Sequence, residues 1–258
     1  MGQFSLSQRD GNLFTITINR PEVMNALHPM ANAELAHLVD QFQADPELWV
    51  AIITGAGDRA FSAGNDLKYQ AASGTRSKHP DTGFAGLTAR WDLDKPVIAA
   101  VNGVAMGGGF EIALACDLVI ASENARFALP EPKVGLAALA GGLHRLPRQI
   151  GVKRAMGMML TGRHVSAAEG KELGFVNDVV PPGQLMDRAT EWAGMILACS
   201  PMSIRATKEA AYGGLDVAEL REAFESRYPA VDNMLGSEDF VEGPKAFSEK
   251  REPQWKGR

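Results

Sequence analysis

The sequence predicts an α/β fold with a helical C-terminal region. Short apolar or alternating segments, typical of strands, mix with helical patterns in the first half of the chain. After about residue 140 the segments have helical spacing. The chain has 258 residues, of which 45% are hydrophobic and 22% charged. This length allows a sizeable core, and the ordinary composition excludes disordered, collagen-like and coiled-coil chains.

The expected elements follow from hydrophobic spacing and from turn residues such as Asp10-Gly11. The predicted strands cover residues 4–7, 13–18, 49–54, 97–101, 118–121 and 127–128. The predicted helices cover residues 29–42, 109–116, 143–147, 154–160, 167–173, 184–197, 202–212 and 217–228, with Ser166 and Ser203 as candidate N-caps. Residues 70–82 have no periodicity and predict a loop. Residues 245–258 predict a solvated tail.

One apolar stretch, from Val97 to Cys116, is long enough to cross a membrane. Its strongly polar members are Asn102 and Glu111, and it contains four glycines. A charged side chain is costly in an isolated membrane span. We therefore interpret the stretch as a buried strand, a glycine turn and a buried helix.

Charge and cysteine usage exclude several classes of protein. Lys and Arg number 26 against 31 Asp and Glu, a net charge of −5, which argues against a nucleic-acid-binding surface. Cys116 and Cys199 are isolated, so neither a zinc motif nor a redox motif is indicated. The chain shows no signal-peptide pattern, and we expect a cytoplasmic location. The histidines lack ligand spacing, and we expect no metal site.

A glycine-rich turn is the first candidate for chemistry. Gly107, Gly108 and Gly109 follow a predicted strand and open a predicted helix. Amides at such a helix start can stabilise an oxyanion; close packing of helix on sheet is an equally good interpretation. Glu111 follows in the most apolar part of the chain, where burial raises the pKa of a carboxyl group and suits it to acid–base catalysis. A salt-bridged core glutamate is the alternative.

Two further segments become candidates for the same site when they are considered together with this turn. Glu131 lies between Pro130 and Pro132, which restrict the backbone and give a carboxylate a rigid mount. The small residues of Phe61–Lys68 follow a predicted strand and could expose a second amide donor. Taken alone, the first segment would be a surface loop and the second an ordinary turn.

Taken together, these segments resemble the crotonase, or enoyl-CoA hydratase/isomerase, superfamily over nearly the whole chain. Within it, residues 83–88, 127–131 and 250–258 are most similar to the carnitinyl-CoA dehydratases. The motifs of the superfamily are Asn19-Arg-Pro with Met24-Asn-Ala-Leu27, Ala51-Ile-Ile-Thr-Gly-Ala-Gly57, Phe61-Ser-Ala-Gly-Asn-Asp-Leu-Lys68, Lys95-Pro-Val-Ile-Ala-Ala-Val-Asn-Gly103, Gly107-Gly-Gly-Phe-Glu111 and Leu160-Thr-Gly162.

The resemblance implies a spiral of ββα turns over residues 1–195 and a helical region at 196–258 that assembles trimers or dimers of trimers. It implies an enoyl-CoA hydratase, a hydro-lyase that adds water to acyl-CoA thioesters. The backbone N–H groups of Asn65 and Gly108 would bind the thioester oxygen. Glu111 and Glu131 would hold the water and transfer its protons. CoA, the substrate's own carrier and not a separate cofactor, would lie on Ala26, Ala63, Asn65, Asp66, Leu67 and Lys68.

Departures from the superfamily pattern concern the acyl group. Asn65 stands where Ala is common, and residues 136–142 lack a common Pro. Competing readings are an enoyl-CoA isomerase, an acyl-CoA hydrolase or a decarboxylase of the same fold, an RNA-binding relative and an inactive homologue. The pair of glutamates favours water chemistry over the first three, and the net charge of −5 disfavours RNA.

Overall fold

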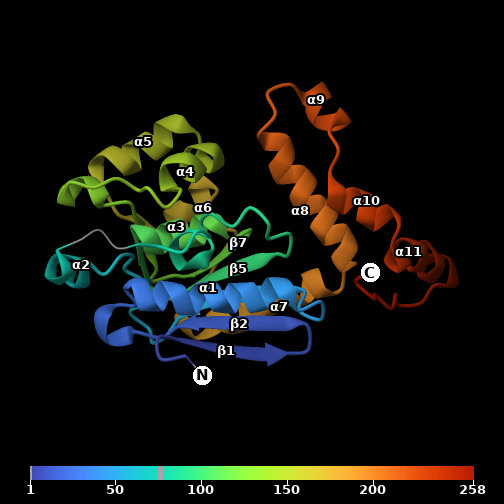
Figure 1. Cartoon of the computed structure of the whole chain (residues 1–258), viewed down its shortest axis with the longest axis horizontal. Coiled ribbons are helices and arrows are strands. Elements are labelled where there is room, and N and C mark those ends of the chain that lie inside the picture. The colour runs from blue at the N-terminus through green and yellow to red at the C-terminus, as the bar shows by residue number, and fades with distance from the viewer. Residues whose placement is uncertain (1, 75–77) are drawn as a thin grey trace.

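Two sheets form the core of the described residues, 2–74 and 78–258, in this computed structural model (Figure 1). The main sheet has the order β1-β2-β3-β5-β7-β10, and the small sheet has the order β4-β6-β8-β9. The strands of the main sheet are β1 (Ser5–Asp10), β2 (Leu13–Ile18), β3 (Val50–Gly55), β5 (Val97–Val101), β7 (Leu118–Ser122) and β10 (Asp178–Val180). Those of the small sheet are β4 (Ala60–Ser62), β6 (Val104–Met106), β8 (Arg126–Ala128) and β9 (Val165–Ser166).

The chain alternates between the two sheets. β3, β5 and β7 are parallel neighbours in the main sheet, and each is followed by β4, β6 or β8 of the small sheet. Helix α2 (Leu67–Ser73) then follows β4, and helix α3 (Gly108–Ala115) follows β6. β4, β6 and β8 are likewise parallel neighbours. This repetition confirms the expected spiral of ββα turns.

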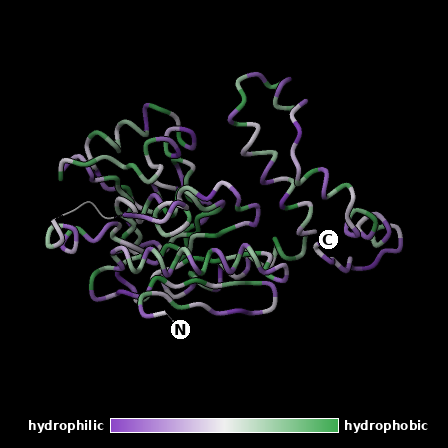
Figure 2. Tube along the Cα trace, viewed as in Figure 1, coloured by the Kyte–Doolittle hydropathy of each residue, from purple (hydrophilic) through white to green (hydrophobic). Residues whose placement is uncertain are grey.

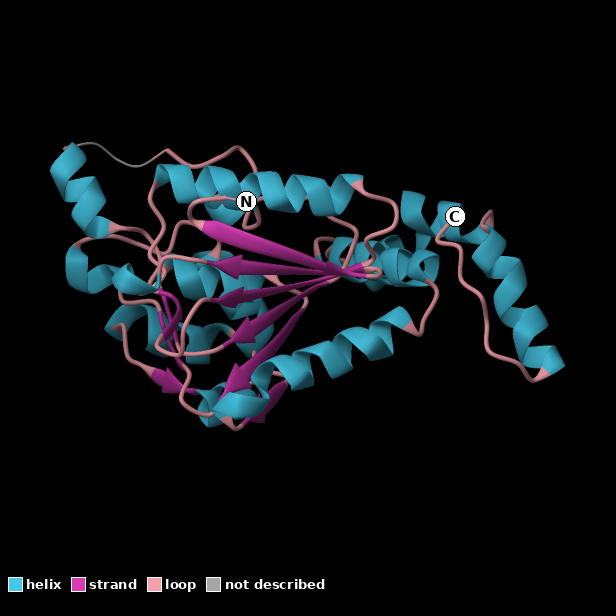
Figure 3. Ribbon diagram, turned by 90° about the horizontal axis from the view of Figure 1, so that it is seen from below, coloured by secondary structure: helices cyan, strands magenta, loops and turns pink. Residues whose placement is uncertain are grey.

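Helices cover both faces of the main sheet (Figure 3). Along β3, Ile53 joins the apolar cluster that includes residues of α1 (Pro29–Ala44), whereas its neighbour Ile52 joins the cluster that includes α7 (Leu185–Leu197). Successive side chains of a strand point to opposite faces, so β3 is buried on both sides. In Figure 2, segments coloured green for hydrophobic residues run through the centre of the molecule, where Figure 1 places the strands β5 and β7.

The second half of the chain is helical, as predicted. Helices α8 to α11 extend away from the sheets (Figure 1). The remaining helices are α4 (Gly142–Ile150), α5 (Val152–Thr161), α6 (Ala167–Leu173), α8 (Pro201–Leu215), α9 (Leu220–Glu225), α10 (Pro229–Leu235) and α11 (Glu238–Glu249), with 3-10 turns at Pro21–Val23, Phe84–Gly86, Glu131–Val134 and Pro182–Gln184. The boundary drawn at 195/196 falls in the last turn of α7, and the division into two units stays a prediction.

Some predicted elements differ from the observed ones. The loop expected at 70–82 begins inside α2, which Asp66 caps by accepting a hydrogen bond from Tyr69 N, 3.0 Å away. Residues 75–77 of that loop lie outside the described residues. Ser166 caps α6, but α8 is capped by Ser200 rather than by Ser203. The helix expected at 217–228 is regular only in α9. The short strands β4, β6, β9 and β10 and the helices α10 and α11 were not predicted.

The expectation of a solvated tail at 245–258 is correct for its exposure, since most of these residues are exposed, but the segment is not a free tail. Residues 245–249 complete α11, and the chain then folds back against the start of the same helix. The buried carboxylate of Asp239 accepts hydrogen bonds from Lys256 N (2.7 Å), Gly257 N (3.2 Å) and the Ser200 hydroxyl (2.8 Å). Trp255 donates to the carbonyl of Ala198. A buried carboxylate with several donors anchors the segment.

The apolar stretch 97–116 forms β5, β6 and α3. The prediction of a strand, a glycine turn and a helix is therefore confirmed, with a second strand between the first strand and the turn. Within residues 2–74 and 78–258, no helix has both the length and the apolar character needed to cross a bilayer.

Candidate active site

Three neighbouring strands of the small sheet end beside the predicted site residues. Asn65 follows the end of β4 by three residues, Gly108 follows β6 by two, and Glu131 follows β8 by three. Because β4, β6 and β8 are parallel neighbours, their carboxyl ends lie along one edge of the sheet. Strands in a sheet are about 4.8 Å apart, so the fold brings residues from three distant segments together at one edge.

Hydrogen bonds of the neighbouring residues fix the direction of the Asn65 amide. Leu27 N donates to the carbonyl of Gly64 (2.8 Å), and Leu27 O accepts from Asp66 N (3.1 Å). Both bonds of this parallel bridge go to the residues flanking Asn65. The Asn65 N–H therefore points away from Leu27, on the opposite side of its strand.

Gly64 places that amide next to the turn before α3. A Cβ built on Gly64 would lie only 2.7 Å from Gly108 N and 2.7 Å from Met106 O. Its φ of +84° is also a backbone conformation that favours glycine. Gly108 is the first residue of α3, where helix amides have no partner within the helix. The amides of Asn65 and Gly108 therefore belong to segments in direct contact.

Glu111 extends from the first turn of α3 into a buried position. Its side chain is 3% exposed, and Oε1 accepts a hydrogen bond from Gly142 N at 2.9 Å. Burial raises the pKa of Glu111 to about 7; the Gly142 hydrogen bond opposes this rise, and the charge of Glu131 adds to it. A carboxyl group with this pKa can either hold or accept a proton near neutrality. The prediction of a buried carboxyl group with a raised pKa is confirmed.

Glu131 begins the 3-10 turn Glu131–Val134 after β8. Its Oε1 lies 3.0 Å from the position that a Cβ of Gly107 would occupy, so the carboxyl group rests against the glycine turn. Oε2 is buried and has no hydrogen-bond partner among the described residues. Burial raises the pKa of Glu131 as well. The Glu131 carboxyl group thus borders the turn before Gly108, and Glu111 follows Gly108 by three residues in α3.

The raised pKa of Glu111 predicts a pH-dependent cost to stability. Because the folded pKa lies above that of the unfolded chain, the folded state binds this proton more tightly, and stability falls as pH rises from 4.5 to about 7. The rise from 4.5 to about 7 corresponds to about 3 kcal/mol of unfolding free energy. Urea unfolding of Glu111→Gln should therefore show a gain over the wild type at pH 8 that nearly vanishes at pH 4.

The control for this titration is Glu123→Gln, at an exposed position in the turn between β7 and β8. Its unfolding free energy should follow that of the wild type at both pH values. Equal gains of Glu111→Gln at pH 4 and pH 8 would contradict the raised pKa.

The predicted CoA-binding residues are brought together beside the two amides. Ala63 N donates to Met24 O (2.9 Å), and the Leu27 bridge joins residues 26–28 to residues 64–66. The side chain of Asn25 holds the strand before this segment, because its amide group donates a hydrogen bond to Ala60 O (2.7 Å). Ala26 and the Ala63–Lys68 segment therefore form one hydrogen-bonded unit. Leu67 and Lys68, at the start of α2, are exposed.

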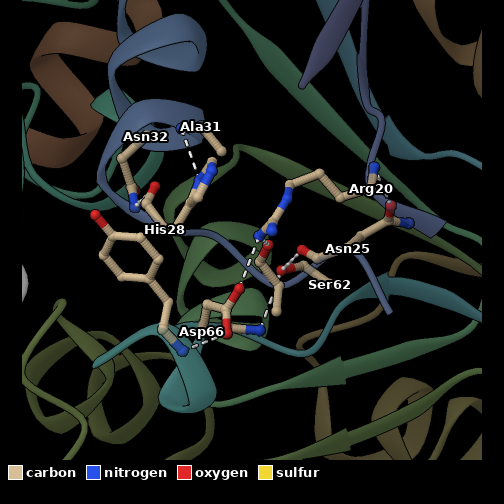
Figure 4. Close-up of polar contacts among 10 residues, drawn as sticks. Arg20, Asn25, His28, Ala31, Asn32, Ser62 and Asp66 are labelled. Carbon is tan, nitrogen blue, oxygen red and sulfur yellow. Dashed lines mark hydrogen bonds and ion pairs between the residues drawn. The ribbon is translucent and has the colours of Figure 1, made fainter. Parts of the chain in front are cut away.

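The side chain of Asp66 is turned inward (Figure 4). It is 8% exposed, forms an ion pair with Arg20 at 3.0 Å and caps α2. Arg20 also donates to the carbonyl of Ala26. His28 is buried and caps α1 by accepting from Ala31 N at 3.1 Å. The Asp66 side chain is thus occupied within the unit, and Arg20 links Ala26 to Asp66.

The side chain of Asn65 has an unsatisfied oxygen. Its Nδ2 donates to Gln70 Oε1 at 2.6 Å, whereas its Oδ1 is buried without a partner among the described residues. Sequence reasoning missed this oxygen, the Arg20–Asp66 pair and the contact of Gly142 with Glu111. An arginine 46 positions from its partner leaves no spacing signal, and Gly142 acts through a backbone amide.

Across residues 2–74 and 78–258, no cluster of three or more His, Cys, Asp or Glu side chains could hold a metal ion. The candidate site consists instead of the buried carboxyl group of Glu111, the half-buried Glu131 and two backbone amides beside the carboxyl ends of β4 and β6.

The sequence and the fold match known proteins. The profile of the enoyl-CoA hydratase/isomerase family matches residues 8–258. Carnitinyl-CoA dehydratases from Salmonella paratyphi A and Salmonella enteritidis are 47% identical over 261 residues, with 97% of each chain covered. Among solved structures, an enoyl-CoA hydratase from Mycobacterium tuberculosis has a TM-score of 0.92 at 37% identity, and a probable enoyl-CoA hydratase/isomerase from Mycobacterium abscessus has 0.91 at 41%; each comparison covers both chains fully.

Proposed function

Because this chain belongs to the enoyl-CoA hydratase/isomerase family, we propose that Glu111 and Glu131 add water reversibly to the double bond of a 2-enoyl-CoA thioester. The enzyme is then a hydro-lyase, and in reverse it dehydrates a 3-hydroxyacyl-CoA. The observation that carries the proposal is the pair of carboxyl groups, Glu111 buried and Glu131 half-buried, both with a raised pKa; that of Glu131 rests against the glycine turn before Gly108.

The two amides bind the thioester oxygen in the proposed reaction. Hydrogen bonds from Asn65 N and Gly108 N polarise the carbonyl group, which makes Cβ of the enoyl chain electrophilic and stabilises the enolate that forms. One donor of this kind contributes roughly 2.7–4 kcal/mol in other oxyanion holes. Gly64 supports this role, since its missing side chain lets the two amide-bearing segments touch.

The two carboxyl groups have different roles in the addition of water. Glu111 accepts a proton from the water that attacks Cβ, and Glu131 delivers a proton to Cα. Two neighbouring carboxylates in a buried site do not both ionise easily, so the pair shares one proton near neutrality. The unpaired Oε2 of Glu131 is available for the water or for the reacting carbon. No further cofactor takes part, because CoA enters as part of the substrate.

We propose that CoA lies along the unit formed by Ala26 and Ala63–Lys68. The backbone of this unit is held by the Leu27 bridge and by Arg20, so its peptide groups have fixed positions before the ligand arrives. Such preorganisation reduces the entropy lost on binding. Lys68 is exposed at the start of α2, where an ammonium group can meet a phosphate.

The experiment that tests the function follows the loss of enoyl-thioester absorbance with two substrates. The likeness to carnitinyl-CoA dehydratases makes crotonobetainyl-CoA the first substrate and crotonyl-CoA the second. Activity on crotonobetainyl-CoA alone supports the narrower likeness, and fast turnover of crotonyl-CoA makes the enzyme a general short-chain hydratase. Failure with both and with longer or branched enoyl chains would contradict the hydratase proposal and favour an isomerase, hydrolase or decarboxylase.

We also propose that the chain assembles as trimers or pairs of trimers through its C-terminal helices, in a cytoplasmic location. The exposed fractions of Leu220 and Phe224 on α9 are 84% and 89%, and that of Phe247 on α11 is 87%. Apolar side chains exposed on a projecting arm favour burial against another chain. Sedimentation of the full chain checks this, and a monomer at micromolar concentration would contradict it.

A further inference from the structure

One aromatic ring lies directly against the proposed oxyanion amide. Phe84 is 3% exposed, and a Cβ built on Gly108 would lie 2.6 Å from its Cε1 and 2.9 Å from its Cζ. The ring therefore rests on the α-carbon of Gly108. His79 packs edge-on against the ring, with the two centroids 5.2 Å apart. Phe84 is thus placed between Gly108 and His79.

The backbone around Phe84 adopts an unusual conformation. Gly83, Ala85 and Gly86 all have positive φ, at 85°, 56° and 67°. For Ala85 this left-handed conformation is unfavourable, because its Cβ crowds the following carbonyl. Strain of this kind persists only where the surroundings impose it, and it is concentrated at functional sites.

Three contacts impose this conformation. The buried side chain of Asn32 on α1 accepts a hydrogen bond from Ala85 N at 2.7 Å. The Thr88 hydroxyl accepts one from Phe84 N at 2.8 Å. Gly86 is pressed against the same helix, since a Cβ built on it would lie 2.2 Å from the Cα of Ala36. Two of these contacts fix the loop to α1 directly after Phe84, and the third closes the loop from Phe84 to Thr88.

The same loop also approaches the turn that holds Glu111. The carbonyl of Thr88 lies 3.9 Å from the position of a Gly141 Cβ, and the next residue, Gly142, donates to Glu111. Residues 84–88 therefore run from the Gly108 amide to the glycine pair beside the carboxyl group. In the proposed reaction the reacting carbons lie between the Gly108 amide and Glu111, and residues 84–88 reach the segments at both ends of that region.

We propose that Phe84 is a positioning and specificity-determining residue: its ring holds the Gly108 amide in place and closes the acyl pocket on that side, which selects short acyl groups. The proposal rests on the proposed function for the class of substrate. A fixed donor is required because small misplacements of a catalytic group lower rates strongly. An aromatic wall excludes chain length by steric contact, as pocket walls do in other enzymes.

The test compares wild type, Phe84→Ala and the more conservative Phe84→Leu on crotonyl-CoA and trans-2-octenoyl-CoA. In both variants kcat for crotonyl-CoA should fall by about tenfold or more, because the donor loses its support. The ratio of kcat/KM for the octenoyl to the crotonyl substrate should rise by about tenfold, because one wall of the pocket is removed. Asn32→Ala should move this ratio in the same direction, since it frees the Ala85 amide.

Two matched controls separate this role from a general loss of packing. Phe42, also fully buried, stacks on Phe14 with the ring centroids 6.3 Å apart, and Phe42→Leu should lower stability without changing the ratio. Ala85→Gly relieves the unfavourable backbone while keeping the loop, and it should keep the wild-type ratio. An unchanged ratio in both Phe84 variants, or an equal change in Phe42→Leu, would overturn the proposal.

Binding separates failure of this proposal from failure of the proposed function. Calorimetry with butyryl-CoA and octanoyl-CoA, which cannot be hydrated, should show the same shift toward the longer chain in Phe84→Leu. A shift in a protein that hydrates no enoyl-CoA would support the role of Phe84 and contradict the hydratase function. If the wild type hydrates enoyl-CoA but the Phe84 variants show no shift in chain-length preference, in binding or in rate, the hydratase function is supported and the role of Phe84 is contradicted.

Discussion

Replacing either carboxyl group of the site by its amide is expected to lower kcat for hydration by about 10²–10⁴-fold, the usual contribution of general acid–base catalysis. Glu111→Gln removes the proton acceptor for the water, and Glu131→Gln removes the donor to Cα. The glutamine at 111 can still accept the hydrogen bond from Gly142 N, so the local fold should persist. Stopped-flow or steady-state loss of enoyl absorbance measures the effect.

The binding of CoA serves as the internal control for these two variants. Neither carboxyl group belongs to the unit of Ala26 and Ala63–Lys68, so the dissociation constant of CoA should change little. Glu123→Gln, at the exposed turn described above, should keep the wild-type kcat. Near-normal turnover by Glu111→Gln or by Glu131→Gln would remove that residue from the mechanism.

A second large effect is expected from Gly64→Ala. The added methyl group would meet Gly108 N and Met106 O, each 2.7 Å away, and must force the two amide-bearing segments apart. Loss of one oxyanion donor lowers kcat by about 10²–10³-fold. The positive φ adds about 1–2 kcal/mol of backbone strain, which unfolding in urea should reveal.

Gly11→Ala is the matched control for Gly64→Ala. Gly11, in the hairpin turn between β1 and β2, has a φ of +56° and no atom within 4 Å of its would-be Cβ. Its substitution should lower stability only by the strain of the positive φ, less than Gly64→Ala, and leave kcat unchanged. If Gly64→Ala retained full activity, the close contact of the two amides would not matter for catalysis.

The sequence predicted those parts of the fold that depend on local spacing. Apolar runs such as 49–54 and 97–101 identified the strands of the main sheet, and the glycines before Glu111 marked the start of α3. The position of Glu111 in an apolar segment was sufficient to predict its burial and the direction of its pKa. The roles of the site residues stay predictions.

Long-range contacts were beyond the reach of the sequence. Nothing in the local pattern indicates that Arg20 pairs with Asp66, that Asn32 holds Ala85, or that Asp239 draws in the last residues of the chain. The strained conformation of Ala85 is imposed by tertiary contacts, since alanine has no preference for it. Such contacts are properties of the assembled layers, and the residues that make them are ordinary in isolation.

The parallel arrangement of β4, β6 and β8 also has a consequence for how such a site can change during evolution. Each strand delivers one functional group to the common edge, and the loops after the strands are separate in sequence. A change of side chain or loop length after one strand can exchange one group while the other two keep their positions. A lineage could in this way trade a carboxylate for another residue and acquire a new reaction on thioesters, without redesign of the donors that hold the carbonyl oxygen.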